Sequence, residues 1–198
     1  MKRRIISHSL LALLILLSSH ADAQKKKADR EKGNKPPFDV GSKTLAFSLG
    51  LGSDYNYNYY YDNTPVVLPT MGVIYDQGII KAGPGIIGIG GYIGAQYAHY
   101  AYNASTATYR NYFIAARGTC HLSIFKDKNS KFDPYGGVTA GFRIFNYNDP
   151  GANFKAGNVY PASGIFVGVK YNFFQHFGVF SEIGYDISFI RFGVNGNF

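Results

Sequence analysis

Histidine and serine residues at short spacing are the first place to look for catalysis in this chain. His121 and Ser123 stand two residues apart, so both side chains share one face if the segment is a strand. His99 and Ser105 form a second pair, but an expected bend separates them. No carboxylate is evident to orient the histidine, as serine-based catalysis requires. Because no nucleophile, base and orienting acid converge, the sequence predicts that the protein is not an enzyme.

Two other motifs that often carry chemistry are also better explained by structure. The glycine runs at 83–85 and 88–91 are not followed by a helix-forming segment, which a phosphate-binding loop needs. Small inward residues that let a tight barrel close explain them more simply. Cys120 is the single cysteine, so it forms no internal disulfide and gathers no metal ligands. We therefore expect no cofactor and no metal site.

Charged side chains recur on one face of the predicted strands. Inside a narrow barrel such charges must pair or be hydrated, because an unpaired buried charge is costly. One interpretation is a network of ion pairs that fills the lumen, and the other is a narrow, slightly cationic conduit. The residues are Asp76, Arg117, His121, Arg143, Lys170, Glu182, Asp186 and Arg191.

Segments of alternating hydrophobicity, separated by turn residues, can position these charges. Apolar side chains at every second position indicate strands with one apolar and one polar or glycine face. A soluble sandwich or lipocalin-like barrel also alternates, but it would leave the glycine and tyrosine face in water. The sequence predicts an all-β fold, an eight-stranded antiparallel transmembrane β-barrel with up-and-down meander topology. The expected strands are 44–52, 68–77, 84–102, 108–125, 134–147, 164–174, 178–186 and 190–198.

The composition agrees with a membrane barrel. Aromatic residues make up 17% of the chain, and Tyr and Phe account for all of them. Charged residues make up only 16%, against about 25% in soluble domains. Aromatic side chains are enriched where barrel strands cross the two membrane interfaces.

The N-terminus reads as an export signal. Lys2, Arg3 and Arg4 precede the apolar run at 10–17, and Ala21-Asp22-Ala23 is a cleavage motif. Eight apolar residues are fewer than the roughly 20 that span a bilayer, so an uncleaved anchor is the weaker alternative. We predict a signal peptide at 1–23, cleaved after Ala23.

Residues 24–43 carry seven basic and three acidic residues and two adjacent prolines. Such a segment predicts a disordered basic periplasmic leader before the barrel at 44–198. Attraction to anionic lipid head groups is the alternative role. Nucleic acid is excluded as a partner in this compartment, and the barrel itself is nearly neutral in charge.

The connections are expected to alternate between short periplasmic turns and longer external loops. Long polar loops are predicted near 53–66 and 148–163, and short turns at 78–83, 126–133 and 175–176. The first loop carries five clustered tyrosines, which suit either anchoring at the outer leaflet or binding of a glycan or protein. They are Tyr55, Tyr57, Tyr59, Tyr60 and Tyr61.

The final strand carries the pattern on which a family resemblance rests. Arg191, Gly193 and Phe198 match the C-terminal assembly signal of small outer-membrane barrels, whereas Gly196 stands where a hydrophobic residue is usual. From residue 44 onward the chain resembles the eight-stranded Gram-negative outer-membrane proteins of the OmpX, OmpA transmembrane-domain and OmpW type. The resemblance implies an outer-membrane location, with lipids, periplasmic chaperones and the outer-membrane assembly machinery as partners.

Families of this shape include structural proteins, adhesins, narrow channels and a few enzymes. The sequence favours a structural or surface-interaction barrel whose lumen is filled by side chains, with an extracellular ligand of unknown identity. The alternatives are a narrow porin-like channel for small solutes and, third, a lipid-modifying enzyme of the outer membrane.

Overall fold

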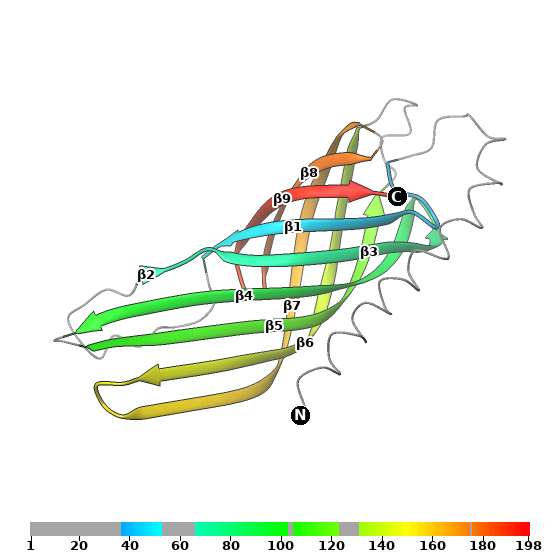
Figure 1. Ribbon diagram of the computed structural model, residues 1–198. Coiled ribbons are helices and arrows are strands. Elements are labelled where there is room, and N and C mark those ends of the chain that lie inside the picture. Colours follow the sequence, from blue (N-terminus) through cyan, green and yellow to red (C-terminus); the bar gives the residue numbers. More distant parts are fainter. Residues whose placement is uncertain (1–36, 53–65, 103–104, 123–130, 175) are drawn as a thin grey trace, which may run out of the picture. The chain divides into compact units, whose positions relative to one another are not determined.

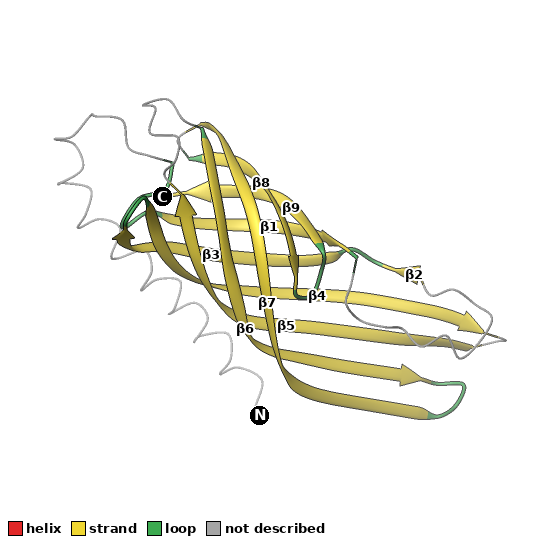
Figure 2. Cartoon of the chain, turned by 180° about the vertical axis from the view of Figure 1, so that it is seen from behind, coloured by secondary structure: helices red, strands yellow, loops and turns green. Residues whose placement is uncertain are grey.

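The structure is a computed structural model that describes residues 37–52, 66–102, 105–122, 131–174 and 176–198. Within these ranges all regular structure is β-strand (Figure 2). No helix long and apolar enough to cross a bilayer occurs in the described ranges. The strands are β1 (Lys43–Leu51), β2 (Val66–Val67), β3 (Thr70–Ala82), β4 (Gly85–Tyr102), β5 (Ser105–Leu122), β6 (Phe132–Asp149), β7 (Phe154–Phe174), β8 (Phe177–Tyr185) and β9 (Ile190–Asn197).

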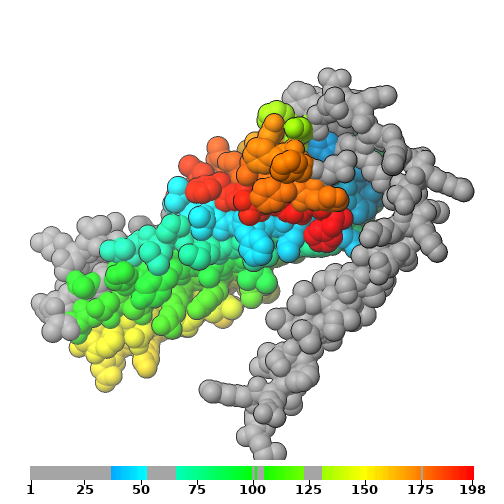
Figure 3. All heavy atoms as spheres, turned by 45° about the horizontal axis from the view of Figure 1, so that its top comes forward, coloured from blue at the N-terminus to red at the C-terminus, as the bar shows by residue number. Residues whose placement is uncertain are grey.

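The strands form a closed antiparallel ring. Each long strand pairs with the next long strand in sequence, and β1 pairs with both β3 and β9 (Figure 1). In the space-filling view, red β9 borders blue-to-cyan β1 along this seam (Figure 3). The backbones of Lys43 and Phe198 exchange two hydrogen bonds of 3.0 and 3.1 Å at its end. Closure removes the sheet edges where all eight long strands pair, and the predicted up-and-down barrel is confirmed.

Eight long strands make the barrel, and the two-residue β2 extends one of them. Val66 and Val67 pair with His99 and Ala98 of β4, beyond the point where β3 stops pairing at Met71. Pro69 lies in the break, and a proline has no N–H to donate to a strand ladder. The second strand, predicted at 68–77, therefore begins two residues later, at Thr70, and residues 66–67 pair separately.

The two ends of the barrel differ. We call the end that holds Lys43 and Asn197 the terminal end, and the opposite end, where β6 turns into β7, the hairpin end. Strands β4 to β7 have 18 to 21 residues, whereas β1, β8 and β9 have eight or nine. The β4–β5 and β6–β7 hairpins therefore extend past the other strands at the hairpin end (Figure 1).

Three predicted connections are wrong in extent, and the turn expected at 126–133 ends earlier because β6 begins at Phe132. The loop expected at 148–163 is a tight turn, because β6 continues to Asp149 and β7 already begins at Phe154. Asn153 closes this turn with a φ of 50°, a conformation that asparagine tolerates better than most residues. The turn expected at 78–83 is also shorter, because β3 continues to Ala82 through an irregularity between Gly78 and Ile80.

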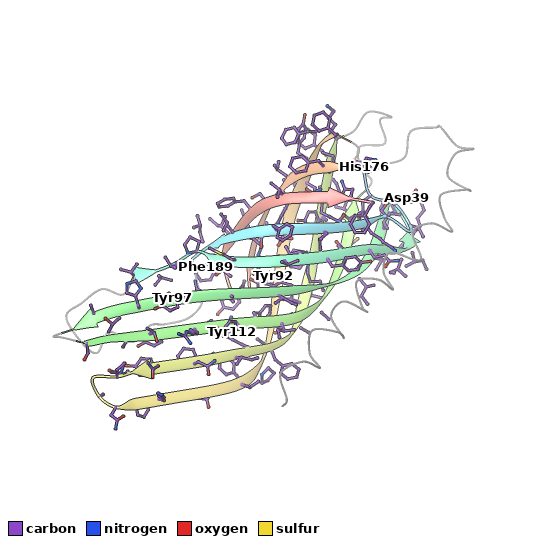
Figure 4. All side chains as sticks on the ribbon, in the orientation of Figure 1. Asp39, Tyr92, Tyr97, Tyr112, His176 and Phe189 are labelled. Carbon is purple, nitrogen blue, oxygen red and sulfur yellow. The ribbon has the colours of Figure 1, made fainter. Side chains whose placement is uncertain are left out.

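The outer surface of the ring is apolar. Outward positions of every long strand carry exposed Val, Leu, Ile, Met or Phe side chains, such as Phe47 at 58% and Ile165 at 65% exposure. Aromatic side chains gather near both ends. Tyr97 and Tyr112 lie toward the hairpin end (Figure 4), and the rings of Phe132, Tyr171 and Phe173 follow one another at 4.8 and 5.0 Å at the terminal end.

Candidate functional site

The lumen of the barrel collects the charged side chains. All eight residues of the predicted charge network lie inside it, and none is more than 5% exposed. They come from β3, β5, β6, β7, β8 and β9 and from Asp186, which directly follows β8. Alternation within each strand puts them there, because their neighbours at odd spacing face outward. They form two clusters, joined by Tyr135.

Glu182 is the centre of the first cluster. Its Oε1 accepts hydrogen bonds from Arg117 Nη2 at 2.6 Å and from the Tyr135 hydroxyl at 2.8 Å. Its Oε2 accepts one from Arg191 Nη1 at 2.6 Å and a longer one from Arg117 Nη1 at 3.4 Å. One carboxylate therefore holds two guanidinium groups and a phenol, and its own two oxygens are fully used.

Asp186 extends this cluster toward the hairpin end. Both of its carboxylate oxygens accept from Arg191 Nη2 at 2.7 Å, and its Oδ1 also accepts from the backbone N–H of Ser188. Arg143 Nη2 donates to the backbone carbonyl of Asp186 at 3.0 Å. Arg191 thus bridges the Glu182 and Asp186 carboxylates with two separate nitrogens. Such charge-assisted hydrogen bonds are the stronger class.

His121 is the centre of the second cluster, near the terminal end. Its Nδ1 lies 2.8 Å from Asp133 Oδ2, and its Nε2 lies 3.0 Å from Asp76 Oδ2. Each ring nitrogen of His121 therefore faces a carboxylate oxygen at hydrogen-bonding distance. Asp76 also accepts from the Thr119 hydroxyl at 3.0 Å, and Lys170 Nζ lies 3.9 Å from it. Two carboxylates and two basic groups balance here.

Aromatic rings fill the space around the charges. The guanidinium carbon of Arg117 lies 3.9 Å from the ring centroid of Phe166, and that of Arg191 lies 4.2 Å from Tyr92. Tyr135 stacks on His121 with a centroid distance of 4.9 Å while its hydroxyl binds Glu182. Cations over ring faces are favourable when water is excluded. Ion pairs and aromatic rings therefore pack against each other in both clusters.

Inward glycines make room for these rings. A Cβ on Gly94 would lie 2.7 Å from Tyr92 Cζ, and a Cβ on Gly168 would lie 2.9 Å from both Tyr135 Cζ and Glu182 Cγ. Real Cβ atoms do not approach so closely. At these positions the glycines accommodate neighbouring side chains.

Three residues that the prediction omitted belong to the site. Asp133 was assigned to a turn, but it lies in β6 and binds His121. Tyr135, on the same inward face, joins the two clusters. Phe38 was assigned to a disordered leader, yet its ring stacks on His121 at a centroid distance of 3.6 Å and is 3% exposed. Inward alternation could have identified the first two, but no sequence pattern marks Phe38.

The catalytic pairs do not assemble. Both nitrogens of His121 already face carboxylates, so neither is available to accept a serine proton, and Ser123 lies outside the described residues. His99 shares the outward face of β4 with Tyr97, whereas alternation puts Ser105 on the inward face of β5. No group of three or more metal-binding side chains occurs among the described residues.

The residues of the expected assembly signal have distinct places. Arg191 lies in the lumen network, and Phe198 is 66% exposed at the terminal end. Gly193 faces inward, where a Cβ would lie 2.8 Å from the ring of Phe180. The atom nearest to a Cβ on Gly196 would be 3.8 Å away, so this departure from the family pattern is not imposed by packing. The five clustered tyrosines, Tyr55 to Tyr61, lie outside the described residues.

Comparison with known proteins finds similarity to solved structures of bacterial outer-membrane proteins at low sequence identity. No family model and no curated protein matches the chain. The chain is similar to the outer membrane protein Ail of Yersinia pestis, with 12% identity and a TM-score of 0.47 over 80% of this chain and 99% of Ail. It is also similar to the outer membrane protein OprG of Pseudomonas aeruginosa, with 10% identity and a TM-score of 0.47 over 81% of this chain and 97% of OprG.

The N-terminal β-barrel domain of Pseudomonas aeruginosa OprF is a third similar structure, with 13% identity and a TM-score of 0.41 over 81% of this chain and 98% of that domain. Because these identities are low, nothing that the three proteins bind is carried over to this chain.

Proposed function

We propose that the protein is an outer-membrane β-barrel with a structural or surface-interaction role and a lumen closed by its own side chains. The observation that carries the proposal is the inverted polarity of the ring. Apolar side chains cover the outside, whereas charged side chains lie inside and are buried. Only a surrounding apolar solvent stabilises this distribution, because in water the exposed apolar surface would cause aggregation.

The closed lumen favours this role over a channel. An eight-stranded ring leaves an interior just wide enough for side chains. Here Arg117, Glu182 and Arg191 are ion-paired across it. The rings of Phe166 and Tyr92 pack on the two arginines, and that of Tyr135 lies under Lys170. Solutes would have to break these pairs to pass. Both nitrogens of His121 face carboxylates, which favours this role over a lipid-modifying enzyme.

The hairpin end is the part suited to interaction. Beyond Tyr97 and Tyr112 the outward side chains become polar, as at Arg110 and Asn146, so the hairpins leave the apolar band. We infer that this end faces the exterior and that the terminal end faces the periplasm. Export through a signal peptide cleaved after Ala23 and insertion by the outer-membrane assembly machinery complete the proposal. Its partners are membrane lipids and an extracellular ligand.

Current recording from the refolded barrel in a planar lipid bilayer tests the role. We expect no stable openings from the native chain. Stable, ion-selective openings that change when Arg117, Arg143 or Lys170 is neutralised would replace the structural role by a channel. Loss of binding to cells or matrix after trimming Tyr55 to Tyr61, in an electrically silent barrel, would support the interaction role.

A further inference from the structure

The segment that precedes β1 folds onto the terminal end of the barrel. Sequence analysis predicts a disordered leader up to residue 43, but residues 37–42 are part of the folded unit. Figure 4 labels Asp39 at this end. Phe38 is only 3% exposed. Three of the six residues at 37–42, namely Asp39, Gly41 and Ser42, are polar or glycine. A buried aromatic ring in so polar a segment needs a specific place to bind.

The ring of Phe38 covers the second charge cluster. It stacks on His121 with centroids 3.6 Å apart and planes 15° apart, and Tyr135 stacks on His121 as well. Lys170 Nζ lies 5.0 Å from the Phe38 centroid and 5.1 Å from the Tyr135 centroid. Two aromatic rings therefore shield both the imidazole and the ammonium group, which is a favourable arrangement for cations away from water.

Backbone hydrogen bonds fix the segment to β3. The N–H of Gly41 donates to the Gly78 carbonyl at 2.9 Å, and the N–H of Gly78 donates to the Ser42 carbonyl at 3.0 Å. Within the segment, the N–H of Asp39 donates to the Ser42 hydroxyl at 3.0 Å. A Cβ on Gly78 would collide with the carbonyl oxygen of Asp39, so this position accepts the segment only as glycine.

We propose that residues 37–42 are a stopper that seals the terminal mouth of the lumen and keeps water from the cluster of Asp76, His121, Asp133 and Lys170. Phe38 is the sealing side chain, and Gly78 is its docking point on the barrel wall. Sealing makes the pairs of this cluster stronger, because charges attract more in a medium of lower dielectric constant.

Lysine labelling of the full-length chain tests the stopper. The refolded protein in detergent micelles is treated with a small water-soluble amine-reactive ester, and labelling rates are read by mass spectrometry. Lys170 is 6% exposed in its side chain, whereas Lys81 is exposed and serves as the internal reference. We expect Lys170 to react at least about tenfold more slowly than Lys81 in the native protein, because reaction requires local opening.

Replacing Phe38 by alanine should raise the rate at Lys170 by about tenfold or more, since burial of a phenylalanine ring contributes more than the free energy of a tenfold change. Gly78→Ala should act in the same direction by displacing Asp39. Phe47→Ala, on the outer surface, and Gly91→Ala, where a Cβ meets only Ala115 O at 3.6 Å, are matched controls that should leave Lys170 protected. Circular dichroism checks that each variant is folded.

Two results would overturn the stopper. One is a native Lys170 that reacts as fast as Lys81, and the other is a folded Phe38→Ala chain in which Lys170 stays protected. If Phe38→Ala fails to fold, the comparison of native protein with Gly78→Ala decides. The outcome is independent of the proposed function, because a barrel without a stopper can still be electrically silent through the Glu182 cluster.

Discussion

Replacing Glu182 by alanine tests whether ion pairing within the lumen stabilises the barrel. The side chain is 2% exposed and accepts hydrogen bonds from Arg117, Arg191 and Tyr135. Arg191 would keep Asp186 at 2.7 Å, but Arg117 pairs with no second carboxylate among the described residues. Breaking a buried pair on one side costs roughly 3 to 5 kcal/mol. We expect a loss of that size, which lowers the folding equilibrium constant by at least about a hundredfold.

Urea unfolding of the refolded barrel in micelles measures this loss. The chain has no tryptophan, so circular dichroism rather than indole fluorescence follows unfolding. Ser181→Ala is the matched control, because Ser181 is the exposed outward neighbour of Glu182 on β8. Its effect should stay within about 0.5 kcal/mol, as for most exposed substitutions.

A second substitution identifies the origin of the loss. If the cost comes from leaving the Arg117 guanidinium buried without its carboxylate, then adding Arg117→Met to Glu182→Ala should recover stability. The double variant should be more stable than Glu182→Ala alone, because removing both charges removes the unpaired one. A double variant that loses the sum of both single effects, or a Glu182→Ala chain as stable as the native one, would refute the reasoning.

Three further predictions concern packing, the turn and assembly. Gly94→Ala should destabilise the barrel by about 1 to 3 kcal/mol, because the added methyl group overpacks against Tyr92. Gly118→Ala is the control and should leave stability unchanged, since its Cβ would meet only Val138 Cγ2 at 3.9 Å. Urea unfolding compares the two variants. Protease added to intact cells should cut at 150–153 and spare 154–163, and equal cutting of both would contradict the long β6–β7 hairpin. Replacing Phe198 by aspartate should deplete the protein from outer-membrane fractions, and unchanged levels on immunoblots would refute its role in assembly.

Alternation made the ring and its inward charges predictable. A strand with one apolar face determines which residues point to the lumen, so Arg117, Glu182 and Arg191 could be assigned inward without any structure. Their partners could not be assigned, because pairing depends on how far each strand is shifted against the next. Glu182 stands opposite Arg191 in register, but Arg117 reaches it across the lumen from β5. Sequence spacing contains no information on that contact.

The length of β6 and β7 at the hairpin end was underestimated for a different reason. Strand prediction in a membrane barrel relies on apolar outward residues, and these are absent where a hairpin leaves the apolar band. Asn146 and Asn158 still lie in paired strands, although neither signals a strand by its type. β6 and β7 pair there because the rest of their length fixes their register, and the four residues at 150–153 complete the hairpin.

Glycine on the inward faces had suggested water-sized gaps and hence a channel. In the structure, large neighbouring side chains lie against several of these glycines. Tyr92 lies against Gly72 and Gly94, with its hydroxyl 2.9 Å from where a Gly72 Cβ would be. At these two positions the missing side chain is thus the space that the Tyr92 ring occupies. In so narrow a ring, rows of small and large inward residues are complementary, and a glycine count alone measures no opening. The positions of these rings are therefore what supports the proposal of a filled lumen.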